Sequence, residues 1–563
     1  MKRNYLLLSF LLLTLIPGCD NHPAFNHKVS RFIASEHLQK ISGKENLAVG
    51  VRELLYEEQN LHNKVLWGEN AFASNIDPAY VPENNPKFPL PYYLVPAEDA
   101  NFLFSDSLDQ RVADQLALKI SGKKHYKLFV HPESEAHYEF LRASYNYVGP
   151  DTTEFMASPT SSYRSLVVWN KNNNQRKPFI AKVSLDKNVI GSIDRLVSIN
   201  EVERSVANQK VFDRMGEKKL TQMNLKIFPE SAGLTIDKTH PGAPEKLGGQ
   251  LIREIPDELV NGDMKWISFS AMMSPNRKTR PLIMDVIEKS GLSSYEFFET
   301  YMINSYMNMF EEVSFKSGVN FEPHSQNLVF ETTKDLKPTG KWVLRDFGGV
   351  WPDVLTMAKN GGPVDVYMEA ASAAKYKLRG GRGNYISSYV FFYKRQVFDM
   401  MLAEVAKLDS SLTPEKVSSL KGKIDARYTK LINSYLGLNL KEAPNMANYQ
   451  AVEKMVLSQT EFDQKNAKKE IKDLENVQTF IETKKANHEW VELAPKKGKS
   501  EFYLTDHGLY EVSNKKIVGL ALFNRNELED YRANNKMLTI FKEEAPIVKK
   551  GGCVAFIRDF LTR

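Results

Sequence analysis

Apolar residues at helical spacing predict helices in several parts of the chain. The segments with this pattern are 20–60, 101–122, about 193–207, most of the chain beyond 370, and the charged amphipathic stretch 461–487. A further long helix is predicted to begin at the capping box Ser293-x-x-Glu296 and to end near Gly318. Aromatic and methionine side chains repeat along this helix at helical spacing. We interpret them as part of the hydrophobic core rather than as a cofactor-binding motif.

Alternating or continuous short apolar runs predict strands between these helices. One buried strand covers 126–130, and short strands are expected at 501–525. Segments rich in proline, asparagine or glycine at 76–96 and 235–250 are interpreted as loops. No stretch after the N-terminus is long and apolar enough to predict a membrane span.

A first β-hairpin is predicted from residues 163–169 and 178–185, joined by a polar loop. If the loop closes symmetrically, paired residue numbers sum to about 347, which sets Arg164 opposite Lys182 or Val183. Arg195 follows the second strand. Like charges that face each other on a sheet are unfavourable unless an anion lies between them.

Three cations with several hydroxyls therefore suit phosphate oxygens, for which arginine is a bidentate partner. The hydroxyls belong to the loop before the first strand, at Ser161, Ser162 and Ser165. The alternative is a pair of basic residues on an exposed sheet face.

A second hairpin is predicted from 327–331 and 341–345, with paired numbers that sum to about 672. This pairing gathers a histidine, two amides and two carboxylates at one end, namely His324, Gln326, Asn327, Glu322 and Asp346. Oxygen ligands of this kind suit Mg²⁺ together with substrate phosphates. His324 could contact a phosphate or the reacting carbonyl. The alternative is a loop of polar residues that satisfy one another.

His131, before Pro132, is a third candidate, although a lone histidine before proline is more often a structural turn residue.

Composition argues against several classes of partner and site. The net charge of +6 over 563 residues is a weak argument for nucleic acid, and we expect no such partner. Only two cysteines exclude a disulfide framework and a cysteine-based metal site.

The N-terminus predicts a targeting signal. Lys2 and Arg3 precede a short apolar run, and the sequence Ile16-Pro17-Gly18-Cys19 looks like a bacterial lipobox with Cys19 as the lipidated residue. Asp20 resembles a signal for retention in the inner membrane. The expectation is thus an inner-membrane lipid anchor. The alternatives are a buried N-terminal helix with an incidental cysteine, or a cytoplasmic protein.

Taken in order, the motifs resemble those of the siderophore synthetases that work without a non-ribosomal peptide synthetase, the aerobactin-synthetase type. The matching motifs are His131-Pro132, Ser161-Ser162-x-Arg164-Ser165, Lys182-x-x-Leu185, Arg195, Glu322-x-His324-x-Gln326-Asn327 and Arg345-Asp346-Phe347. The resemblance runs from about 125 to 350. It implies an α+β fold with a cupped-hand architecture, divided after a signal at 1–19 into a thumb (20–122), fingers (123–250) and a palm (251–563).

The resemblance also implies an activity. Such enzymes adenylate citrate or a related carboxylate with ATP and Mg²⁺, then join the acyl group to an amine or hydroxy amine, and dimers are common among them. Carried over, the ATP contacts would be Ser161, Ser162, Arg164, Ser165, Lys182, Gln326, Asn327 and Asp346. His131 and Arg195 would orient the carboxylate, Glu322 and Asp346 would hold the metal, and His324, Arg195 and Lys182 would be catalytic.

Three features depart from the family. Ser165 stands where the family's loop usually ends in threonine, which is a mild change. Glu133 and Ser134 follow His131-Pro132 where the family usually has tryptophan and glutamine, and the lipobox is foreign to cytoplasmic enzymes. Two rival hypotheses therefore stay open. One is a kinase-like phosphotransferase, because His324-x-x-Asn327 and Asp346-Phe347-Gly348 echo kinase motifs. The other is an exported, non-catalytic lipoprotein that binds citrate, a siderophore or a nucleotide.

Overall fold

The computed structural model describes residues 47–59, 76–190, 193–236, 248–353 and 384–456, apart from 274, 277–279 and a few neighbouring side chains. It also describes parts of 354–367 and the backbone of four strands between 490 and 522. The predicted lipobox and the predicted helix at 461–487 lie outside these residues. Within the described residues, no helix is long and apolar enough to cross a membrane.

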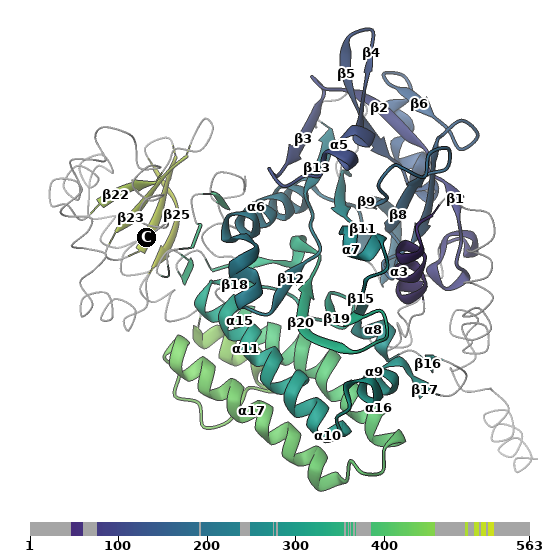
Figure 1. The fold of residues 1–563 in the computed structure, drawn as a ribbon. Helices are drawn as coiled ribbons and strands as arrows, with labels where there is room; N and C mark the ends of the chain where they lie inside the picture. The colour runs from purple at the N-terminus through teal and green to yellow at the C-terminus, as the bar shows by residue number, and fades with distance from the viewer. Residues whose placement is uncertain are drawn as a thin grey trace, which may run out of the picture.

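A seven-stranded antiparallel sheet forms the upper part of the molecule in Figure 1. Its strands, in spatial order, are β1 (Phe88–Pro89), β7 (Phe155–Pro159), β8 (Ser165–Asn170), β9 (Phe179–Val183), β14 (Gln250–Glu254), β13 (Ala232–Ile236) and β3 (Ala100–Phe104). Its central strands are buried on both faces, which explains their continuous rather than alternating apolar sequence. The first predicted hairpin is thus confirmed as β8 and β9.

A four-stranded sheet lies beside it, in the order β4 (Ala117–Ile120), β5 (Lys123–Phe129), β2 (Tyr92–Pro96) and β6 (Asn146–Val148). The loop predicted at 76–96 was wrong for β2, because its prolines stand at the strand's ends rather than inside it. The helix predicted at 101–122 was also wrong in large part. Only α5 (Gln110–Leu116) is helical there, and β3 and β4 flank it because their side chains pack on the two sheets.

The second predicted hairpin is confirmed as β19 (Leu328–Thr333) and β20 (Pro338–Leu344). These strands lie in a sheet with the order β12 (Leu225–Ile227), β20, β19 and β15 (Met264–Ser268), in which β12 and β20 are parallel. Short elements surround the two hairpins: α3 (Val49–Gln59), η3 (Pro78–Tyr80), η4 (Pro82–Asn84), η5 (Pro132–Leu141), α7 (Asp257–Val260), α8 (Phe269–Met272), β16 (Pro275–Asn276), β17 (Arg280–Pro281), β18 (Val319–Asn320), η8 (Phe347–Gly349) and β21 (Trp351–Pro352).

The long helix α6 (Ile199–Gln222) packs against both regions, with contacts to β13, β3, β12 and η8. It begins later than predicted, because residues before it form the small hairpin β10 (Leu185–Ile190) and β11 (Ile193–Arg195). Ser198 caps the helix by accepting a hydrogen bond from the backbone of Glu201.

Helices fill the lower part of the molecule in Figure 1. They are α9 (Leu282–Ser290), α10 (Ser294–Phe297), η6 (Phe298–Ser305), α11 (Tyr306–Phe310), η7 (Glu311–Lys316), α15 (Asn384–Ser387), η9 (Ser388–Asp399), α16 (Met400–Leu408) and α17 (Pro414–Leu436). The predicted capping box of Ser293 and Glu296 is present, and Gly318 has the positive φ of 69° expected after a helix end.

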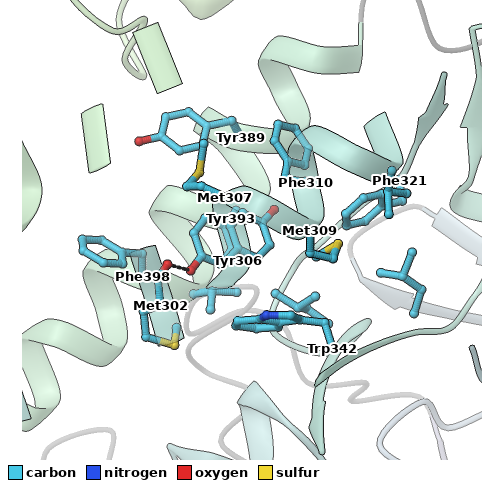
Figure 2. Close-up of a cluster of buried hydrophobic side chains, with 14 of the residues drawn as sticks. Met302, Tyr306, Met307, Met309, Phe310, Phe321, Trp342, Tyr389, Tyr393 and Phe398 are labelled. Atoms are coloured by element: carbon cyan, nitrogen blue, oxygen red, sulfur yellow. Dashed lines mark hydrogen bonds between the residues drawn. The ribbon is translucent and has the colours of Figure 1, made fainter. Parts of the chain in front are cut away.

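The aromatic and methionine stripe is core, as predicted (Figure 2). The rings of Tyr306 and Tyr393 stack with centroids 3.3 Å apart, and Trp342 packs edge-on to Tyr306. Tyr393 donates a hydrogen bond to the Met302 carbonyl, which satisfies its buried hydroxyl.

The predicted C-terminal strands are also present, as an antiparallel sheet of β22 (Trp490–Leu493), β23 (Ser500–Thr505), β24 (Gly508–Ser513) and β25 (Lys516–Leu522). Helices and mainly antiparallel sheets in separate regions confirm the α+β fold class.

Candidate functional site

The register of the first hairpin is the predicted one. Ser165 faces Lys182, and the backbone of Val183 donates to the Arg164 carbonyl over 2.9 Å, so paired numbers sum to 347 as expected. The Lys182 side chain is buried with only 4% of its surface exposed. The hairpin therefore brings the two cations side by side at its open end.

Carboxylates lie between these cations. Lys182 Nζ is 2.7 Å from Glu201 Oε1 and 2.5 Å from Asp346 Oδ1, and Arg164 Nη2 is 3.2 Å from the same Glu201 oxygen. Arg164 Nη1 also donates to the Arg195 carbonyl over 2.9 Å. Arg164 and Lys182 thus converge as predicted, whereas the bond to Arg195 is to its backbone carbonyl. The anion that the sequence argument required is provided here by Glu201, which that argument missed.

Neighbouring charges favour the charged forms of Lys182, Asp346 and Glu201. Burial alone would lower the pKa of Lys182, but the charges of Asp346 and Glu201 outweigh it and raise that pKa. Burial would raise the pKa of Asp346 and of Glu201, and neighbouring cations, Lys182 foremost for Asp346 and Arg164 for Glu201, lower both. The result is a buried, pre-formed set of charges.

The end of the second hairpin holds a neutral histidine. His324 Nδ1 accepts hydrogen bonds from the backbone of Gln326 (3.2 Å) and Asn327 (3.3 Å), which leaves the proton of the neutral ring on Nε2. Burial lowers the pKa of His324 to about 4, although the nearby charge of Asp346 opposes this. A neutral imidazole of this tautomer can donate to an oxygen at Nε2.

A buried network joins the two hairpins and the helix α3. Glu58, on α3, accepts hydrogen bonds from Ser161 Oγ (2.7 Å) and Arg345 Nη1 (2.6 Å), and Arg345 Nη2 donates to Ser161 Oγ (3.0 Å). Gln326 Nε2 donates to the Ser161 carbonyl over 2.7 Å. The hydroxyl of Ser161 is thus bound by protein groups. Ser165 is also buried, while Ser162 is half-buried.

A strained turn presents Asp346. Its φ of 67° lies in the left-handed region, which is costly for a residue other than glycine and is often found at functional sites. Residues of α6 hold the turn that follows: Arg204 Nε donates to the Gly348 carbonyl (2.6 Å), and Asn208 Nδ2 donates to the carbonyls of Phe347 (2.9 Å) and Val350 (3.0 Å).

Sequence reasoning missed these α6 residues. The signal was present, because Glu201, Arg204 and Asn208 are polar positions at helical spacing on an otherwise apolar face.

Glu322 lies close to this turn. Burial first, then the charge of Asp346, raises the pKa of Glu322 to about 7. A Cβ on Gly349 would come within 3.1 Å of Glu322 Oε2, so glycine there leaves room for the carboxylate. No cluster of three or more metal-ligating side chains occurs among the described residues. The pair of carboxylates nevertheless fits Mg²⁺, which proteins commonly hold through one or two carboxylates and substrate phosphates.

His131 is a turn residue in this structure. Its Nδ1 accepts from the backbone of Glu133 (3.1 Å) at the start of η5, and its ring lies edge-on to Tyr80 and Phe88. The side chain is fully buried, its Nε2 has no hydrogen-bond partner among the described residues, and burial lowers its pKa to about 3.

The two residues that depart from the family pattern tie η5 to β10. Glu133 forms an ion pair with Lys187, with 3.3 Å between the atoms, and Ser134 Oγ accepts from the Asp186 backbone over 2.8 Å.

The comparisons with known proteins agree with the motifs. Residues 70–274, which carry the first hairpin and its cations, match the model of the IucA / IucC family. Over this segment the chain resembles that family. A search of curated protein sequences finds no match.

Solved structures extend the likeness in fold beyond that segment. The ATP-bound aerobactin synthetase IucA of Klebsiella pneumoniae superposes with a TM-score of 0.54 at 14% identity, covering 73% of each chain. Aerobactin synthetase IucC of the same organism gives 0.51 at 17% identity, covering 72% of this chain and 74% of IucC. At this identity the likeness shows a common fold, and the α+β architecture is therefore that of the IucA / IucC synthetases.

Proposed function

We propose that this protein is a synthetase of siderophore biosynthesis that uses ATP and Mg²⁺ to activate a carboxylate and then joins the acyl group to an amine or an alcohol. One observation carries the proposal. Two cations (Arg164, Lys182), a partly buried carboxylate (Asp346) and a neutral histidine (His324) lie at the adjoining ends of two hairpins. The chain around them has the fold of aerobactin synthetases and, over residues 70–274, matches the IucA / IucC family.

In the first step a carboxylate oxygen attacks the α-phosphorus of ATP, and pyrophosphate leaves. Lys182 and Arg164 stabilise the charge on the phosphate oxygens, as fixed cations in a water-poor site do most effectively. Ser162, Ser165, Gln326 and Asn327 line the proposed nucleotide site. Glu322 and Asp346 would hold Mg²⁺, which supplies further charge neutralisation to the phosphates.

In the second step the amine or hydroxyl attacks the acyl carbon, AMP leaves with the bonding electron pair, and the nucleophile releases its proton to solvent. His324 donates through Nε2 to the oxygen that gains charge. Arg195 binds the remaining carboxylates of citrate or a related acid. The unpartnered Nε2–H of His131 is suited to the same role, because a buried donor without a partner favours an acceptor.

In this proposal, three regions of the chain have different roles. We assign the thumb to 20–122, the fingers with the phosphate-binding hairpin to 123–250, and the palm to 251–563. The site described above lies where the fingers' hairpin β8–β9 meets the palm's hairpin β19–β20, joined by Gln326 and Ser161.

Analysis of the nucleotide product tests the proposal. The full-length protein is incubated with ATP, Mg²⁺, citrate and a panel of diamines and hydroxy amines, and the nucleotides are separated by chromatography. We expect AMP and pyrophosphate in equal amounts, dependent on citrate. Lys182→Ala should lose this activity, and Lys171→Ala, in the exposed loop of the same hairpin, should retain it. ADP as the product would indicate a phosphotransferase, and binding of citrate or nucleotide without turnover would indicate a binding protein.

A further inference from the structure

Glu201 does not adopt the conformation that its local sequence favours. Ser198-x-x-Glu201 has the spacing of a capping box, in which the glutamate turns back to the backbone of the capping serine. Ser293 and Glu296 form this box in full, with Glu296 Oε2 accepting from the Ser293 backbone over 2.9 Å. The carboxylate of Glu201 lies against the cations of the sheet instead.

One oxygen of Glu201 bridges both cations. Its Oε1 is 2.7 Å from Lys182 Nζ and 3.2 Å from Arg164 Nη2, and the side chain is only 16% exposed. Two cations this close in a largely buried setting repel each other, so without Glu201 the side chains would turn apart or Lys182 would lose its proton. The backbone makes room for this arrangement, because a Cβ on Gly348 would come within 2.9 Å of Glu201 Cγ.

Both cations keep hydrogen-bond donors for a further anion. An ammonium has three N–H groups, and Lys182 uses two of them on Glu201 and Asp346. A guanidinium has five, and Arg164 uses one on Glu201 and one on the Arg195 carbonyl. Glu201 can therefore remain in place when a phosphate arrives.

We infer that Glu201 is a positioning residue, which holds Lys182 and Arg164 side by side so that both meet the phosphate oxygens of ATP; this inference rests on the proposed function. Glu201 itself takes no part in the reaction. Glu201 aligns the cations before ATP binds, and the bound phosphates then hold the same cations in place themselves, so the loss of Glu201 acts mainly on the KM for ATP and much less on kcat.

The test compares Glu201→Gln with Glu217→Gln, an exposed position on the same helix. Pyrophosphate release is measured at increasing ATP with citrate and amine held constant. We expect the KM for ATP to rise about tenfold or more in Glu201→Gln, with kcat changed by about twofold at most. Glu201→Asp, which retains the charge on a shorter side chain, should give an intermediate KM, and Glu217→Gln should match the wild type.

An unchanged KM for ATP in Glu201→Gln would overturn the inference, and a lowered KM would show that Glu201 competes with the phosphates instead. If Glu201→Gln does not fold, Glu201→Asp decides by the same criterion. If the wild type releases no pyrophosphate, the proposed function fails on its own. Calorimetric titration of wild type and Glu201→Gln with ATP then tests the positioning role separately, and equal affinities, including no binding by either, would overturn it.

Discussion

Lys182 is a buried cation whose charge depends on its neighbours. It lies in the middle of a seven-stranded sheet, where an isolated ammonium would lose its proton. Asp346 comes from a turn far away in the sequence and Glu201 from the helix α6, and together they keep Lys182 charged. The site is thus assembled by tertiary structure, and its charges are fixed before any ligand binds, which is the arrangement that electrostatic catalysis requires.

Arg164→Ala tests whether the side chain of this residue binds a phosphate of ATP. The change removes a largely buried charged donor and leaves Glu201 with one partner fewer. We expect carboxylate-dependent pyrophosphate release to fall by a factor that corresponds to about 2–5 kcal/mol. Arg176→Ala, at the exposed far end of the same hairpin, is the control and should retain full activity. Wild-type turnover by Arg164→Ala would remove Arg164 from the proposed site.

Residue contacts were predictable where the chain pairs with itself locally. In each hairpin the predicted register, in which paired residue numbers have a constant sum, placed Arg164 beside Lys182 and Asn327 beside Arg345. A symmetric loop fixes the register of both strands. Glu58 and Glu201 could not be found in this way. Each is one of three glutamates on its helix, and only the packing of that helix against the sheets brings this one to the site.

At the scale of elements, the approach of α6 to the turn at 346–350 depends on Gly348. A methyl group there would displace Glu201, so Gly348→Ala should raise the KM for ATP severalfold. Gly422→Ala, in α17, adds the same methyl group where no atom lies within 4 Å. Because alanine favours helices, that control should raise stability by about 0.5–1 kcal/mol without a change in KM. Steady-state kinetics that show the same KM for both variants would contradict this account of the turn.

The helix α3 carries a buried carboxyl group that makes stability depend on pH. Burial, as the leading cause, raises the pKa of Glu57 from its ordinary 4.5 to about 7. Between these values the folded protein binds the proton more tightly than the unfolded chain, so the contribution of Glu57 to stability falls as pH rises from about 4.5 through 7.

Glu57→Gln should therefore stabilise the protein at pH 8 by up to about 3 kcal/mol, and by much less at pH 5. Urea unfolding at the two pH values measures this difference. If Glu57→Gln raises the free energy of unfolding equally at both pH values, the raised pKa assigned to Glu57 is contradicted.

The positions at which helices and strands begin and end were the features least predictable from the sequence. The strands β2 and β3 were expected as loop and helix, because their burial is decided by neighbouring sheets rather than by local periodicity. The start of α6 was misplaced for a related reason, since the residues before it pair as β10 and β11. The long helix after Ser293 was predicted well, because its capping box and apolar stripe are both local signals.

For the whole molecule, the buried ion pair of Glu58 and Arg345 joins α3 to the ends of both hairpins. Glu58→Gln leaves Arg345 buried without its counter-charge and should cost about 3–5 kcal/mol of stability. Thermal unfolding measures the loss. Glu404→Gln breaks an exposed pair with Lys407 and should shift stability by less than about 1 kcal/mol. Equal effects in the two variants would show that the network does not hold these elements together.

The order of motifs between 125 and 350 led to the resemblance to siderophore synthetases and so to the expected α+β class. The family model matches residues 70–274, and the two aerobactin synthetase structures bear out the fold. The lipid anchor at Cys19, the division into thumb, fingers and palm, and a possible homodimer remain predictions. The proposed use of ATP requires that an anchored protein face the cytoplasm.

The central claim is that this site adenylates a carboxylate, and isotope exchange tests it most directly. The protein is incubated with ATP, Mg²⁺, labelled pyrophosphate and citrate, without any amine. The account predicts that label enters ATP only when the carboxylate is present, and that Lys182→Ala abolishes the exchange. If no carboxylate supports exchange in a preparation that binds ATP, the claim that this site forms an acyl adenylate is contradicted.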